Sequence, residues 1–79
     1  MPVHYLKTWP EYFEAIKKGI KTFEVRLNDR NFLPGDELCL RKYLPEKRQY
    51  EPDCIWVNVL YVLEGPEFGI GEGVCCNVY

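Results

Sequence analysis

The feature that most constrains this chain is a change of hydrophobic period at Gly19. Before it, apolar side chains recur at the three- and four-residue spacing of one helical face, namely Trp9, Tyr12, Phe13 and Ile16. Thr8 stands where a helix N-cap would be, with Glu11 at the spacing of a capping box. Gly19 suits the position just after a helix, because glycine adopts a left-handed backbone without strain. The pattern predicts one amphipathic helix that begins after Thr8 and ends at Gly19.

After Gly19 the period becomes two, as in a β-strand. Residues 22–28 alternate between an apolar and a polar set, and the apolar set is Phe23, Val25 and Leu27. The polar set is Thr22, Glu24, Arg26 and Asn28. Because a row of four polar side chains is unsuited to a core, we expect their face to meet water or to line a cleft.

Four further segments are predicted to be strands: residues 3–6, 37–43, 54–63 and 74–79. Leu38 and Leu40 are expected to point inward. Residues 44–53 hold two prolines and many charges, and residues 65–73 hold four glycines and a proline, so both are expected to be loops. The order β-α-β-β-β-β predicts a single α+β domain over residues 1–79, folded as a small closed or nearly closed β-barrel of about five strands with one main helix.

The charge balance limits the classes of partner. Ten Lys and Arg residues against twelve Asp and Glu residues give a formal net charge of −2 and a pI of about 5.3. Proteins that bind nucleic acid through bulk charge usually carry a basic excess, so that mode is disfavoured. Nucleic acid stays open as a partner because residues 17–30 and 41–48 are locally basic. No apolar run approaches the length of a membrane span, so we expect no membrane partner.

The cysteines lack the spacing of a metal site. Cys39 and Cys54 stand alone, Cys75 and Cys76 are adjacent, and His4 is the only histidine. A structural zinc site needs paired ligands at short spacing, and the geometry of a disulfide disfavours a bridge between neighbours. We therefore expect no metal and no cofactor. With no signal peptide before the first predicted strand, reduced thiols in the cytoplasm are expected; the role of Cys75 and Cys76 is open.

Three charged residues follow the predicted helix closely enough to form one site. Glu24 and Arg26 share a strand face with Cα atoms about 7 Å apart, and Lys21 lies at the helix-to-strand corner, within reach of both. The alternative is a solvated strand face with an ion pair worth about 0–1 kcal/mol. His4 has two interpretations, an acid or base in a cleft or, as the favoured one, a structural histidine near the barrel rim.

One run of this chain resembles the G-x-K-x-x-E-x-R signature of ASCH domains, which belong to the PUA-like superfamily: Gly19-Ile20-Lys21-Thr22-Phe23-Glu24-Val25-Arg26. Other segments are similar to a compact, largely uncharacterised branch of that group, so that the resemblance covers nearly the whole chain: residues 4–7, 9–13, 15–16, 28–30, 35–36, 61–63 and 68–70. The resemblance implies a β-barrel with a cleft between the helix and the barrel mouth. It also implies that the signature residues line this cleft and that the ligand is RNA or nucleotide-like.

Our leading hypothesis is a module that binds RNA or a nucleotide through four residues: Lys21, Glu24, Arg26 and Arg30. A lysine offers phosphate a point charge and an arginine offers a planar fork. Glu24 would accept from a base amino group or hold Arg26 in place. RNA recognition also uses aromatic stacking, for which the candidates are Trp9, Tyr43, Trp56 and Phe68. Core packing is the favoured interpretation of Trp9 and Trp56.

Two alternatives stay open. Some small ASCH-like proteins hydrolyse the acetyl amide of a modified cytidine, which suggests a hydrolase acting on a modified nucleoside or RNA with Lys21 and Glu24 as catalytic proton-transfer groups. Those proteins have a threonine where this sequence has Glu24, and because a carboxylate is not a hydroxyl nucleophile, the resemblance does not carry their activity over directly. The other alternative is a protein-interaction accessory domain, which the acidic pI allows. The pattern does not predict the oligomeric state.

Overall fold

The computed structural model describes residues 2–79, which form six strands and one α-helix. The elements follow in the order β1 (Val3–Thr8), α1 (Pro10–Lys17), β2 (Phe23–Leu27), β3 (Glu37–Leu44), β4 (Gln49–Asn58), β5 (Tyr61–Glu64), a 3-10 turn (Glu67–Gly69) and β6 (Val74–Val78). The α+β class predicted from the sequence is therefore confirmed. Within residues 2–79, no helix is both long enough and apolar enough to span a membrane.

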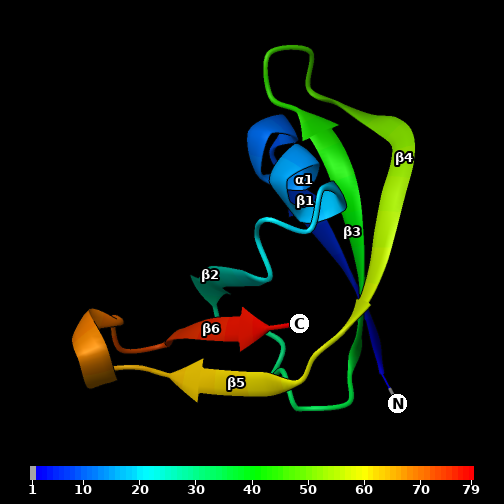
Figure 1. The fold of residues 1–79 in the computed structure, drawn as a ribbon. Coiled ribbons are helices and arrows are strands. Elements are labelled where there is room, and N and C mark those ends of the chain that lie inside the picture. Colours follow the sequence, from blue (N-terminus) through cyan, green and yellow to red (C-terminus); the bar gives the residue numbers. More distant parts are fainter. Residues whose placement is uncertain (1) are drawn as a thin grey trace.

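The strands form two three-stranded sheets rather than one closed ladder. The first has the order β1-β3-β4, with β1 parallel to β3, and the second has the antiparallel order β2-β6-β5. In Figure 1, α1 lies against the first sheet and the second sheet lies across its lower end. Among the described residues the two sheets share no strand, so the closed barrel expected from the sequence is not seen as a continuous ladder.

The division into two sheets arises within residues 54–63, where the sequence predicts one long strand. The chain breaks at Val59 and Leu60, between β4 and β5. The Val59 N–H donates to the carbonyl of Asp36, the residue before β3, at 2.8 Å, whereas the Leu60 N–H donates to the carbonyl of Val78, the last residue of β6, at 2.7 Å. Neighbouring amides thus bond to different sheets. This is why the structure has six strands where about five are predicted.

The predicted loop at residues 44–53 is wrong in its second half. β4 begins at Gln49, and Tyr50 pairs with Tyr43 of β3. Pro52 lies inside this strand. A proline has no N–H to donate, but β4 is an edge strand, where that donor is not needed. Only residues 45–48 turn the chain between β3 and β4.

The core lies between the two sheets and below the helix. Seven buried residues from both sheets, the helix and the connections form one cluster: Leu6, Ile16, Phe32, Leu38, Leu40, Val59 and Cys75. The predicted inward direction of Leu38 and Leu40 is confirmed, because neither is exposed. Tyr79 packs against this cluster from the end of the chain. The second sheet is thus held to the first through shared side-chain packing.

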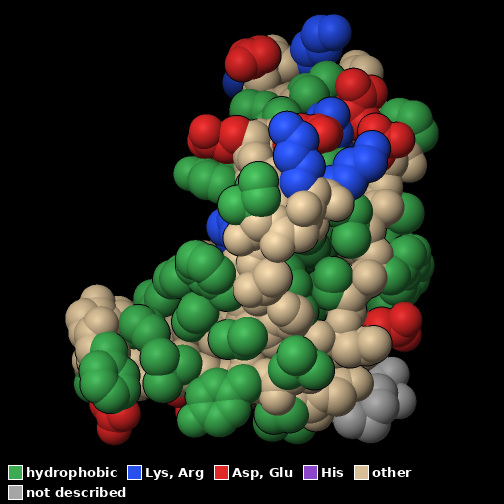
Figure 2. Space-filling view, in the orientation of Figure 1, with side chains coloured by type: hydrophobic (Ala, Val, Ile, Leu, Met, Phe, Trp, Pro, Cys, Tyr) green, Lys and Arg blue, Asp and Glu red, His purple; other side chains and the backbone are tan. Residues whose placement is uncertain are grey.

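In β2 the alternation is confirmed, and the polar face is the more buried of the two. Phe23, Val25 and Leu27 are 45%, 57% and 67% exposed, whereas Glu24 and Arg26 are half-buried. The register with β6 explains this, because Glu24 and Arg26 pair with two fully buried residues and share their face: Asn77 and Cys75. Hydrophobic side chains consequently cover much of the lobe of β2, β5 and β6 in Figure 2.

The helix α1 ends as predicted and begins differently. Gly19 has a φ of +77°, the left-handed conformation that favours glycine after a helix. The N–H groups of Ile20 and Lys21 both donate to the Ala15 carbonyl, at 3.0 and 3.1 Å. At the other end Thr8 is the last residue of β1, so the predicted N-cap is wrong. Trp9 holds that position without a side-chain bond, and Pro10 follows in the first turn.

Candidate functional site

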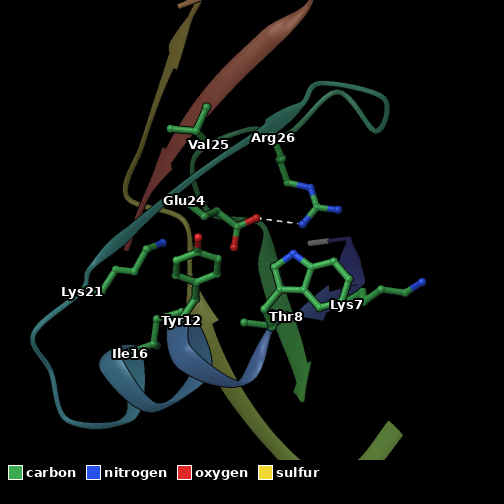
Figure 3. A pocket seen from close by; sticks show the side chains of 9 residues that line it. Lys7, Thr8, Tyr12, Ile16, Lys21, Glu24, Val25 and Arg26 are labelled. Atoms are coloured by element: carbon green, nitrogen blue, oxygen red, sulfur yellow. Dashed lines mark hydrogen bonds and ion pairs between the residues drawn. The ribbon is translucent and has the colours of Figure 1, made fainter. Parts of the chain in front are cut away.

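A cleft of about 420 Å³ lies where the end of β1, the helix α1 and the strand β2 meet. Its lining combines three cations, one carboxylate and two aromatic rings with smaller side chains: Lys7, Thr8, Trp9, Tyr12, Ile16, Lys21, Glu24, Val25 and Arg26. Figure 3 shows Tyr12 rising from α1 toward β2, with Lys21 on one side and Glu24 and Arg26 on the other. The structure therefore brings together three of the four predicted ligand residues.

Glu24 and Arg26 form an ion pair at the wall of the cleft. Arg26 Nη1 donates to Glu24 Oε2 at 3.0 Å, and the side chains are 26% and 12% exposed respectively. This pair is better shielded from water than the surface pair considered from the sequence. Arg26 Nε is buried and has no hydrogen-bond partner within residues 2–79. Glu24 thus holds one nitrogen of the guanidinium, and the other N–H groups remain as donors.

Tyr79 does not line the cleft but contacts Glu24 of its wall, and it has no counterpart in the site predicted from the sequence. Its hydroxyl lies 3.4 Å from Glu24 Oε1 and 3.3 Å from the Phe23 carbonyl, so its proton is shared between two acceptors. Burial, together with the negative charge of Glu24, raises the pKa of Tyr79 well above its usual value. No local spacing signals this contact. It follows from the β2–β6 register, which carries Tyr79 back to the start of β2.

Lys21 lies at the opposite side of the cleft from Arg26. Its amine donates to the Phe23 carbonyl and stands 5.5 Å above the centre of the Tyr12 ring and 4.8 Å above that of Phe23. The cation is therefore positioned by its own loop and by two rings. Together with Arg26 it gives the cleft a positive charge on two sides of Tyr12.

The strand β1, the junction at Trp9 and the helix α1 contribute five residues to the cleft: Lys7, Thr8, Trp9, Tyr12 and Ile16. The sequence gives one signal for these residues. Residues 7–9 join the first predicted strand to the predicted helix, so they must lie beside the start of that helix. Trp9 and Tyr12 are 42% and 44% exposed, so the expectation that Trp9 packs in the core is wrong. Only Phe13 and Ile16 of the predicted helical face are buried.

Two residues weighed from the sequence lie outside the cleft. His4 Nε2 is 3.0 Å from Asp36 Oδ2, and the His4 ring meets Phe32 edge-to-face. This is the structural position favoured for His4. Arg30 does not line the cleft; its Nη1 donates to the Tyr5 carbonyl of β1 at 3.1 Å.

The cysteine sulfurs are not paired with one another in the structure. Cys39 and Cys75 are buried, Cys54 is exposed and Cys76 is half-buried. Over residues 2–79 no group of three or more His, Cys, Asp and Glu side chains is placed to hold a metal ion. The chemistry that the cleft offers therefore comes from its cations, its shielded carboxylate and its two exposed rings.

A search of curated proteins finds no match to this sequence. A family model does match it, over residues 3–76, and is described as a domain of unknown function, DUF3850. The matched segment includes α1, five of the six strands in full, most of β6 and every residue that lines the cleft. The chain belongs to the DUF3850 family.

Proposed function

We propose that this domain is a module that binds RNA or a nucleotide in the cleft between α1 and β2. The observation that carries the proposal is the placement of Lys21 and Arg26 around the exposed rings of Trp9 and Tyr12 within one cavity. Its volume of about 420 Å³ lies in the range of pockets that take small organic ligands. A nucleotide needs both a cation for its phosphate and a ring for its base, and this cavity offers both.

The three cations of the cleft would contact a phosphate in two ways. Arg26 offers the guanidinium donors that Glu24 leaves unused, and a planar fork of this kind matches two phosphate oxygens. Lys7 and Lys21 add point charges at the edges of the cavity. The base would stack on Tyr12 or Trp9, since unstacked bases of single-stranded RNA rest on aromatic side chains.

The contacts of Glu24 favour binding over hydrolysis. Its Oε2 accepts from Arg26 and its Oε1 accepts from Tyr79. A carboxylate with both oxygens engaged acts as a support for Arg26, whereas a general base needs an oxygen directed at the substrate proton. We therefore assign Glu24 a positioning role and make hydrolysis an outcome of the test below.

The proposal extends to the architecture and the compartment. The helix between β1 and β2, the cleft lined by Lys21, Glu24 and Arg26, and the core shared by two sheets support kinship with the ASCH group of PUA-like barrels. Four cysteines that are not bridged to one another support the reducing cytoplasm as the site of action.

The test is an amide NMR titration of the labelled domain with single-stranded RNA, nucleoside monophosphates and modified nucleosides, with product signals followed in the same tubes. Binding in the cleft predicts shifts at residues 7–12 and 21–26 that saturate, without product. Product that disappears in Glu24→Gln would establish the hydrolase instead. Shifts confined to the β5–β6 end, or none with any of these ligands, would overturn the proposal and favour a protein partner.

A further inference from the structure

The outer face of the first sheet carries a strip of aromatic rings and cations. The register places Tyr5, Cys39 and Trp56 in one row across β1, β3 and β4, and Lys7, Arg41 and Cys54 in the next. A third row holds the paired Tyr43 and Tyr50. The rows lie about 7 Å apart, because side chains on one face of a strand are two residues apart. Tyr5, Trp56 and Tyr50 are 57%, 50% and 40% exposed, which makes the expected core packing of Trp56 wrong.

The rings and cations of this strip contact one another. Tyr5 and Trp56 meet edge-to-face with ring centres 6.1 Å apart, and Tyr43 and Tyr50 do so at 5.0 Å. Lys7 Nζ stands 4.2 Å above the Tyr43 ring. In the same way the Arg41 guanidinium stands 4.1 Å above the Tyr50 ring. The rings are thereby held on a rigid sheet beside positive charge.

The three rows contain two cations and no carboxylate. The exposed face of the second sheet provides a contrast within the same molecule. Its rows, built on Phe23, Val25 and Leu27, are also apolar and open, with Tyr61 60% exposed, yet they contain no Lys or Arg. The rows of the first sheet thus combine open rings with two cations of their own, and this is the combination that binds unpaired bases and their phosphates.

We propose that this strip, which we call the aromatic platform and define as Tyr5, Lys7, Arg41, Tyr43, Tyr50 and Trp56, binds the bases of single-stranded RNA that continues from the cleft. The inference rests on the proposed function and deepens it, because it identifies the ligand as an extended strand rather than a free nucleotide. Three rows on one sheet face give room for about two or three bases, as on other sheet platforms.

The cleft and the aromatic platform are continuous. Lys7 lines the cleft and covers Tyr43 of the platform. Trp9 also lines the cleft, and its ring centre is 5.8 Å from that of Tyr43. A strand that leaves the cleft past Trp9 thus meets the platform at Tyr43. Double-stranded RNA does not fit this surface, since its bases are stacked inside the helix.

The test compares variants of the whole domain by fluorescence anisotropy with a labelled single-stranded octanucleotide RNA. Trp56→Ala and Tyr50→Ala each remove one open ring, and each is expected to weaken binding about 5- to 150-fold, the range for loss of one stacked base. Tyr61→Ala is the matched control, since it removes a ring from the other sheet that is at least as exposed as these two, and it is expected to leave affinity unchanged. An amide spectrum of each variant checks that the fold is retained.

The outcomes separate the platform from the cleft. Loss of affinity in both platform variants and in Arg26→Gln supports both sites. Loss in the platform variants alone supports the platform and overturns the cleft, whereas loss in Arg26→Gln alone overturns the platform. An equal loss in Tyr61→Ala, or equal affinity for a double-stranded RNA of the same length, also overturns the platform. No measurable binding of the octanucleotide by the parent domain overturns both.

Discussion

At the scale of single residues, the two carboxylate oxygens of Glu24 bond to different partners, one near in the sequence and one distant. Arg26 donates to one oxygen and Tyr79 to the other. The first partner lies two positions along the same strand, so the sequence spacing predicts it. The second is 55 positions away, and only the folded sheet brings it there. Of these two contacts of Glu24, the sequence thus predicts the one that lies within a single strand.

The hydroxyl of Tyr79 makes stability depend on pH in the alkaline range. Its pKa is raised in the folded state, above the value near 10 of an unfolded chain. The folded protein therefore keeps this proton longer, and the resulting stability is present below about pH 10 and lost as the pH rises toward the folded pKa. We expect Tyr79→Phe to cost about 1 kcal/mol at pH 7, the worth of a typical hydrogen bond, and this deficit to shrink above about pH 10.

Urea unfolding of the parent and of Tyr79→Phe at several pH values between 7 and about 11 measures this effect. A deficit that stays constant across the whole range would show that the Tyr79 proton is not held more tightly in the folded protein.

At the scale of elements, local patterns predict what is determined locally. The helix between Thr8 and Gly19 and the strand with Leu38 and Leu40 inward are both confirmed. The end of one sheet and the start of the next at Val59 and Leu60 depend on hydrogen bonds to Asp36 and to β6, which no window of the sequence contains. The first half of β4 is missed for a similar reason, since Pro52 is acceptable only at a sheet edge.

The burial of β2 is the sharpest case, because the sequence indicates that its polar face meets water or a cleft, but not that this face is more buried than the apolar one. Leu27 is 67% exposed while Leu38 is fully buried. We expect Leu38→Ala to lower the free energy of unfolding by about 2–5 kcal/mol, as is usual for a buried leucine. Leu27→Ala should change it by no more than about 0.5 kcal/mol. Equal losses in chemical denaturation would show that the Leu27 face of β2 is packed as tightly as the Leu38 face of β3, contrary to the structure.

At the scale of the whole molecule, the charge is distributed unevenly. All ten Lys and Arg residues lie between positions 7 and 48, so β5 and β6 carry none. In Figure 2 the blue side chains gather at the end that holds α1 and the upper part of β3, away from the hydrophobic lobe. The cleft lining holds three cations and one carboxylate, so it is positively charged although the formal net charge of the chain is −2.

The site could be predicted from the sequence only where its residues are neighbours in the chain. Lys21, Glu24 and Arg26 line one cleft, as their spacing predicts. Arg30 is four positions beyond Arg26 and instead bonds to β1. Tyr12 belongs to the predicted helix, but the position of the Lys21 amine over its ring depends on the turn at residues 18–21. Contacts between elements thus account for most of what the sequence does not predict.

We propose that the local charge of the cleft, rather than the total charge of the domain, holds a phosphate of RNA. Arg26→Gln and Lys17→Gln each remove one positive charge, but Arg26 lines the cleft whereas Lys17 is exposed on α1 and does not. They form a matched pair of variants, and an amide spectrum confirms that each is folded.

The most direct measurement is the dissociation constant of a single-stranded RNA for these two variants and the parent over a series of salt concentrations. We predict that Arg26→Gln weakens binding and reduces the slope of log K against log salt by about 0.7, the value for one phosphate contact on a single strand. Lys17→Gln should match the parent in both affinity and slope. Equal affinity and slope for Arg26→Gln and the parent would contradict the proposed RNA binding in the cleft, because the guanidinium would then bind no phosphate.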